Sequence, residues 1–101
     1  MDQQLAERLR LTSANSINIA RWLPQQLYYF LAMQQWPASQ VAPIIVVPSG
    51  NLGNIAAGLL AKKSGLVTGH FIAACNVNDT VTDFLKTGIH TPKQAVMTYS
   101  N

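Results

Sequence analysis

The chain has 101 residues, 49% of them hydrophobic, and a net charge of +3 from 7 Lys and Arg against 4 Asp and Glu. Only 11% of the residues are charged, whereas about a quarter is usual for a soluble domain, so we expect part of the surface to be covered by protein. The basic residues are dispersed, which excludes a nucleic-acid interface, and no apolar run reaches the roughly 18 residues that a membrane-spanning helix needs.

The first third of the chain has a helical pattern. Leu5 and Leu9 have helical spacing, so residues 1–12 are predicted to end a helical element. A cluster of hydrogen-bonding side chains over residues 12–16 predicts the N-terminus of a second helix. Pro24 lacks an amide donor and is expected to kink or restart that helix. Its amphipathic character is predicted by apolar residues three and four positions apart, at Ile17, Ala20, Leu23, Leu27 and Leu31.

Two predicted strands follow, with a predicted helix between them. The β-branched run 44–47 is typical of a parallel strand that is buried on both faces. A helix is predicted from Ile55 to about Ser64, where Gly65 suits a left-handed stop. Residues 70–74 are predicted to form a second buried strand.

The last part of the chain predicts one more helix. Asn78 or Asp79 can cap a helix over residues 81–86, which Gly88 would close. Residues 95–99 are a candidate third strand. The order of the elements predicts an α/β fold, a three-layer α/β/α segment with a short parallel sheet, in which residues 1–101 form a single incomplete domain.

Histidine and cysteine are too sparse for a metal or disulfide framework. Cys75 is alone, and with His70 and His90 it shows no paired ligand spacing, so no metal site is predicted. A single cysteine favours a reducing compartment. Because the N-terminus also lacks the pattern of a signal peptide, a cytoplasmic location is expected.

The most informative segment is the turn between the first strand and the next helix. It contains Ser49, Gly50, Asn51, Leu52, Gly53 and Asn54. Glycines permit positive φ and close approach of a ligand, and a helix N-terminus offers unpaired amides and a positive dipole end. The pattern therefore favours a cradle for a phosphate or another anion, although it matches no standard nucleotide-binding motif and a purely structural turn is the alternative.

A second group of polar residues precedes and begins the long helix. It consists of Asn15, Ser16, Asn18 and Arg21. The planar guanidinium of arginine suits a carboxylate or a phosphate. A capped helix with a solvated arginine is the alternative, so this group by itself is not decisive.

Taken together, these segments resemble threonine synthase, a pyridoxal-phosphate enzyme of fold type II. The resemblance is colinear and covers about nine-tenths of the chain. It is carried by SANSINIAR at 13–21, YYF at 28–30, VPSGNLGN at 47–54, AG at 57–58, GL at 65–66, FIAACNVNDTV at 71–81, FLKTG at 84–88 and TYSN at 98–101.

The resemblance implies a reaction and a division of roles. Threonine synthases are lyases of threonine biosynthesis that convert O-phospho-L-homoserine and water into L-threonine and phosphate, with pyridoxal 5'-phosphate as the electron sink. The 49–54 loop would bind the cofactor phosphate, and backbone donation tolerates Leu52, where the family more often has an aromatic residue. Asn15, Ser16, Asn18 and Arg21 would bind the substrate phosphate.

The chain also departs from the family. The lysine that forms the Schiff base lies well upstream in threonine synthases, and no lysine precedes Lys62 here. The resemblance therefore implies an internal segment that is inactive alone, contains no catalytic residue and relies on the rest of the same polypeptide. Exposed strand edges would favour self-association of the isolated segment.

Two other classes of function stay open beside this one. One is a non-catalytic α/β module that binds phosphate or another anion. The other is a fold type II dehydratase, which the 15–21 segment disfavours because a dehydratase has no substrate phosphate to hold.

Overall fold

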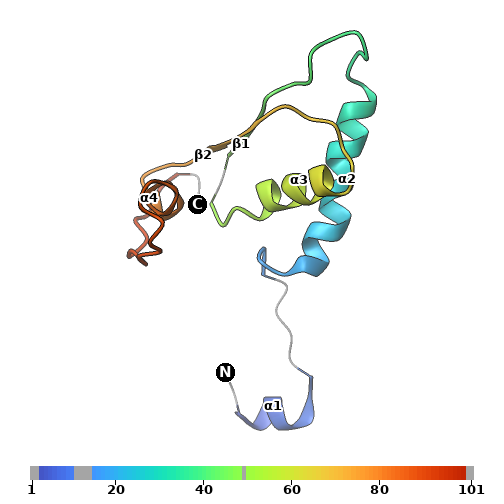
Figure 1. Ribbon diagram of the computed structural model, residues 1–101. Helices are drawn as coiled ribbons and strands as arrows, with labels where there is room; N and C mark the ends of the chain where they lie inside the picture. Colours follow the sequence, from blue (N-terminus) through green and yellow to red (C-terminus); the bar gives the residue numbers. More distant parts are fainter. Residues whose placement is uncertain (1–2, 11–14, 49, 100–101) are drawn as a thin grey trace.

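The computed structural model describes residues 3–10, 15–48 and 50–99. Their elements follow one another in the predicted order, with boundaries that differ by a few residues (Figure 1). They are α1 (Gln3–Arg8), α2 (Ile19–Gln34), β1 (Ile45–Pro48), α3 (Gly53–Lys63), β2 (Phe71–Ala74) and α4 (Thr80–Thr87). No described helix is long and apolar enough to cross a membrane.

The two strands form a parallel pair, as predicted. Their register runs from Ile45 opposite Phe71 to Pro48 opposite Ala74. α3 makes the crossover between them and packs against α2 (Figure 1). A short parallel sheet with a helical connection is the predicted α/β arrangement, and it directs the end of β1 toward the start of α3.

The core lies mainly between α2 and α3. Tyr29, Ala57 and Ala61 are buried, and Trp22 and Phe71 pack against them. By contrast, the leucine stripe of α2, Leu23, Leu27 and Leu31, is about half exposed. The apolar spacing thus predicted the helix, but its packed face is the aromatic one, because the small residues of α3 leave room there for large rings.

α2 begins at an asparagine and continues through a proline. The side chain of Asn18 caps the helix by accepting a hydrogen bond from the amide of Ala20, at 2.9 Å. Pro24 lies inside the helix, which does not restart there. Trp22 and Tyr29, on either side of Pro24, both pack on the core, so tertiary contacts hold the helix across the missing amide.

The predicted third strand is wrong for the described residues, because 95–99 form none. The side chain of Asn78 donates to the carbonyl of Val96 at 2.9 Å and accepts from its amide at 2.8 Å. Asn76 donates to the hydroxyl of Thr98 at 3.0 Å. A side-chain amide therefore uses the backbone groups of Val96 that a strand ladder would need.

An ion-pair cluster holds the segment after α4 against the start of that helix. The ammonium of Lys93 contacts the carboxylates of Asp79, at 3.0 Å, and Asp83. The hydrogen bond from Lys93 lowers the pKa of Asp79, while the bonds to Asp83 and Asp79 raise the pKa of Lys93. Asp79, one of the two predicted capping residues, is the N-cap residue of α4, but its side chain makes no cap hydrogen bond.

The described chain is extended and exposes much apolar surface. Its radius of gyration is 17.0 Å, against about 13 Å for a compact chain of 100 residues. Large apolar side chains such as Ile44, Val46 and Leu85 are more than half exposed. Extensive exposed apolar surface is typical of chains that pack against other protein.

We predict that Gly58→Ala destabilises the chain. A Cβ at this position would lie 2.6 Å from Phe71 Cε1 and 2.7 Å from Tyr29 Cζ. Alanine gains about 1 kcal/mol of helix propensity, but overpacking a core costs about 1–3 kcal/mol, so the free energy of unfolding should fall. Urea unfolding followed by circular dichroism measures this. Gly50→Ala is the control, because a Cβ there meets nothing within 4 Å; equal stability of the two variants would contradict the prediction.

Candidate functional site

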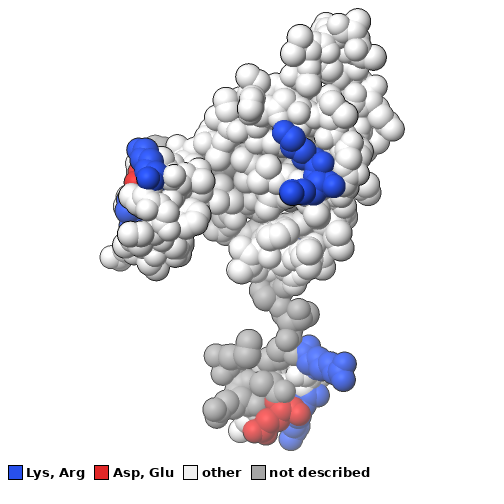
Figure 2. All heavy atoms as spheres, in the orientation of Figure 1, with Lys and Arg blue, Asp and Glu red and all other residues white. Residues whose placement is uncertain are grey.

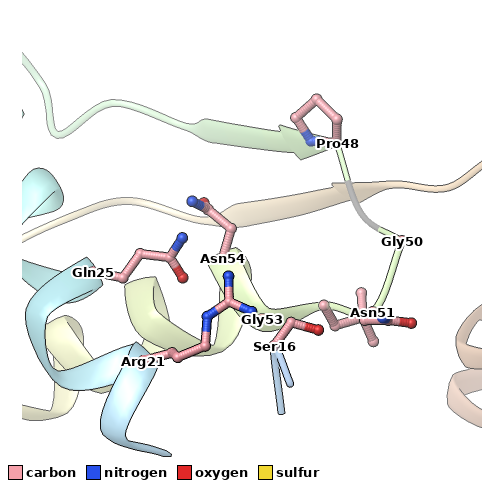
Figure 3. Close-up of a pocket in the computed structure, with 9 residues that line it drawn as sticks. Ser16, Arg21, Gln25, Pro48, Gly50, Asn51, Gly53 and Asn54 are labelled. Carbon is pink, nitrogen blue, oxygen red and sulfur yellow. The ribbon is translucent and has the colours of Figure 1, made fainter. Parts of the chain in front are cut away.

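A pocket of about 420 Å³ lies between the start of α2 and the loop that joins β1 to α3. Figure 3 shows side chains from both segments around it. Its lining residues are Ser16, Arg21, Gln25, Pro48, Gly50, Asn51, Leu52, Gly53 and Asn54. The structure thus brings together the two groups of residues that the sequence singled out separately.

The N-terminus of α3 forms one wall of this pocket. Leu52 is its N-cap residue, makes no side-chain cap hydrogen bond and has a left-handed φ of 59°. The amide of Ala56 makes the first helical bond, to the carbonyl of Leu52 at 2.9 Å. The amides before it belong to the positive end of the helix, which favours an anion.

The predicted reason for the glycines in this loop is partly wrong. Among the described residues of the loop, positive φ occurs at Leu52 and at neither Gly50 nor Gly53. Gly53 is buried and allows the backbone of Ser16 to approach closely, because a Cβ at position 53 would lie only 2.8 Å from the carbonyl oxygen of Ser16. That contact joins the segment before α2 to the first residue of α3.

Two aromatic residues of α2 hold the pocket-lining backbone in place. The indole nitrogen of Trp22 donates to the carbonyl of Ser16 at 2.7 Å. The hydroxyl of Tyr29 lies 3.0 Å from the carbonyl oxygen of Asn54 and also contacts its side-chain oxygen. Burial raises the pKa of the Tyr29 hydroxyl, so it stays protonated and able to donate at neutral pH.

The opposite wall carries the charge. In Figure 3 the guanidinium of Arg21 and the amide of Gln25 extend from α2 toward the start of α3, where Asn54 lies. Arg21 is the only cation among the described lining residues, and none of them is acidic. On the face shown in Figure 2, acidic side chains lie only around α1 and α4. The electrostatics of the pocket therefore favour a phosphate or a carboxylate.

Most of the predicted site residues line this pocket, and a few do not. Ser16, Arg21 and residues 50–54 are in its wall. Asn15 and Asn18 are not: Asn15 accepts from the Ser16 hydroxyl at 3.3 Å, and the Asn18 side chain caps α2. Ser49 lies outside the described residues.

Sequence reasoning did not assign two of the lining residues to the site. Pro48 ends β1, and nothing in its residue type indicates ligand binding. Gln25 follows Arg21 by four positions, and this spacing places both on one face of α2. Helical spacing from a charged site residue is therefore the signal that could have found it.

The side chains that line the pocket include donors that suit an anion. No lysine, cysteine or histidine is among its described lining residues. In the part of the chain that the structure describes, no three side chains of His, Cys, Asp or Glu gather as a metal site. On its own this surface can bind and orient a phosphate.

Comparison with known proteins gives one consistent result. The chain is 52% identical over 101 residues to the threonine synthases of Serratia marcescens and Escherichia coli strain K12, across 99% of this chain and 24% of each relative. No protein-family model matches it. The chain therefore spans about a quarter of the length of these relatives.

Solved structures agree with the sequence relatives. The crystal structure of threonine synthase from Escherichia coli superposes with a TM-score of 0.85, over 97% of this chain and 23% of that one. A threonine synthase from Brucella melitensis with bound pyridoxal phosphate gives 0.83 at 38% identity, over 98% of this chain and 21% of that one. The predicted resemblance to threonine synthase and the α/β fold that it implied are both confirmed.

We predict that Arg21→Gln weakens binding of inorganic phosphate to the pocket. A hydrogen bond to a charged group contributes about 1.5–3 kcal/mol, so we expect the dissociation constant to rise about tenfold or more. Titration calorimetry at low and at physiological salt measures this. Lys63→Gln is the matched control, because it removes the same charge from the far end of α3. An equal loss of phosphate affinity in the two variants would contradict the prediction, because the affinity would then depend only on net charge.

Proposed function

We propose that this chain is the phosphate-binding segment of a threonine synthase, which converts O-phospho-L-homoserine and water into L-threonine and phosphate. The observation that carries the proposal is the single pocket formed by the 50–54 loop and by Ser16 and Arg21. The homology to threonine synthases over nearly the whole chain supports it. We also place the enzyme in the cytoplasm, which the unpaired Cys75 supports.

The loop before α3 fits the phosphate of pyridoxal phosphate. Backbone amides at the start of α3 can donate hydrogen bonds to this phosphate. A Cβ at Gly50 would meet nothing within 4 Å, so the loop leaves open space beside these donors. We assign Ser49, Gly50, Asn51, Leu52, Gly53 and Asn54 to this group. When bound, the cofactor supplies an electron sink for the carbon that loses a proton.

The residues from the start of α2 fit the phosphate of the substrate. Arg21 offers a planar, permanently charged pair of donors, Ser16 offers a hydroxyl, and Gln25 offers an amide beside them. These groups can hold the phosphate before and after it leaves carbon. Asn15 and Asn18 keep the Ser16 segment and the start of α2 in place through their side chains.

The second candidate is a non-catalytic module that binds a phosphate or another anion. The absence of lysine among the described lining residues favours it, since nothing there can attach the cofactor covalently. In the proposed enzyme that lysine comes from the rest of the same polypeptide. Activity of the full-length protein therefore separates the two candidates.

We predict that the 101-residue chain alone forms no threonine, whereas the full-length enzyme that carries it does. The chain offers a phosphate site without the lysine that the reaction needs. Incubation with pyridoxal phosphate and O-phospho-L-homoserine, followed by assay of threonine and phosphate, measures this. Threonine formation by the chain alone would contradict the assignment of roles, and an inactive full-length protein would favour the binding module.

We predict that Gly53→Val in the full-length enzyme weakens cofactor retention with little loss of fold. The added side chain displaces the Ser16 carbonyl and the start of α3, and each charge-assisted hydrogen bond that is lost costs about tenfold in affinity. The absorbance of the bound cofactor during dialysis measures retention. Ala38→Val, which also introduces a branched side chain but at an exposed position outside the pocket, is the control; unchanged retention in Gly53→Val would contradict the prediction.

A further inference from the structure

Two hydrogen bonds run from one face of α2 to the two halves of the pocket. Trp22 and Tyr29 are seven residues apart, which is close to two helical turns, so both rings face α3. Trp22 bonds to the carbonyl of Ser16, at 2.7 Å. Tyr29 bonds to Asn54, whose carbonyl oxygen lies 3.0 Å from the hydroxyl. Both partners line the pocket.

The Trp22 bond acts on the side of the pocket that Ser16 and Arg21 form, which is assigned above to the substrate phosphate. Ser16 lies before α2, so helical hydrogen bonds do not hold its backbone. The indole N–H can only donate, and its ring is half-buried against the core, so packing fixes where the donor points. The Ser16 carbonyl is thereby held between the indole and Gly53.

The Tyr29 bond acts on the side of the pocket that the 50–54 loop and the start of α3 form, which is assigned above to the cofactor phosphate. Its ring is 7% exposed and makes an edge-to-face contact with Phe71, with ring centroids 5.7 Å apart. The hydroxyl therefore has little freedom and holds the first turn of α3 through both the backbone and the side chain of Asn54. This first turn provides the amides assigned above to the cofactor phosphate.

We propose that Trp22 and Tyr29 are positioning residues with separate tasks, Trp22 orienting Ser16 for the substrate phosphate and Tyr29 orienting Asn54 and the start of α3 for the cofactor phosphate. This assignment rests on the proposed function. Neither side chain is among the residues that line the pocket, so each acts through a residue that does.

Two variants of the full-length enzyme that carries this segment test the separation. Tyr29→Phe should raise the dissociation constant of pyridoxal phosphate about five- to tenfold, the usual effect of one lost hydrogen bond, with KM at saturating cofactor nearly unchanged. Trp22→Phe should raise KM for O-phospho-L-homoserine about five- to tenfold, with cofactor affinity and absorbance nearly unchanged. A benzothienyl analogue of tryptophan at position 22 keeps the ring shape, lacks the N–H and should reproduce the Trp22→Phe effect.

The chain offers a matched control for each variant. Tyr28→Phe removes the hydroxyl of a neighbouring tyrosine that is 69% exposed. Trp36→Phe removes an indole that donates to the carbonyl of Val41 at 3.2 Å, outside the pocket. Both controls should keep the dissociation constant of pyridoxal phosphate and the KM for O-phospho-L-homoserine close to those of the unmodified enzyme.

The outcomes separate this proposal from the function on which it rests. If both constants rise together in each variant, with lower thermal stability, the residues are merely structural and the proposal is overturned. Variants that behave like their controls overturn it as well. An unmodified full-length protein that binds no cofactor and forms no threonine overturns the proposed function, and this assignment with it.

Discussion

The close approach of the Ser16 carbonyl to Gly53 is the constraint on which the site depends. A Cβ at position 53 would lie 2.8 Å from that oxygen, so only glycine lets the segment before α2 rest on the start of α3. This contact places Arg21 and Ser16 beside the positive end of α3. Without it, the structure would contain a loop with unpaired amides and a separate exposed arginine. With it, the two form one pocket that carries positive charge and no acidic group among its described residues.

Stability and the site share the same residues. Tyr29 belongs to the buried core and also holds Asn54, and Trp22 packs on that core while it holds Ser16. Gly58 and the alanines of α3 leave the room that these rings occupy. Packing between α2 and α3 therefore fixes the pocket geometry, and the parallel pair β1–β2 directs the loop into it. A binding surface supported in this way is preorganised, which lowers the entropy lost when an anion binds.

Local signals predicted the elements and much of the site, and they failed where distant groups compete. The spacing of three to four positions between apolar residues indicated α2. It did not indicate that Tyr29 would be buried while Leu23, Leu27 and Leu31 are about half exposed. The pattern at 95–99 indicated a strand, because sequence alone does not show that the Asn78 side chain takes the backbone groups of Val96. The loop indicated an anion site, yet the left-handed residue among its described positions is Leu52, which no propensity would select.

The sequence by itself determined the order of the elements, the parallel pairing and two polar segments suited to anions, because propensity, periodicity and charge act over a few neighbouring residues. It also carried the resemblance to threonine synthase, since a colinear pattern needs no coordinates. Only the tertiary structure decided that the two segments share one pocket and that Gln25 and Pro48 line it. Those outcomes depend on the packing of α2 against α3, which brings together residues that are about 30 positions apart and that no local rule relates.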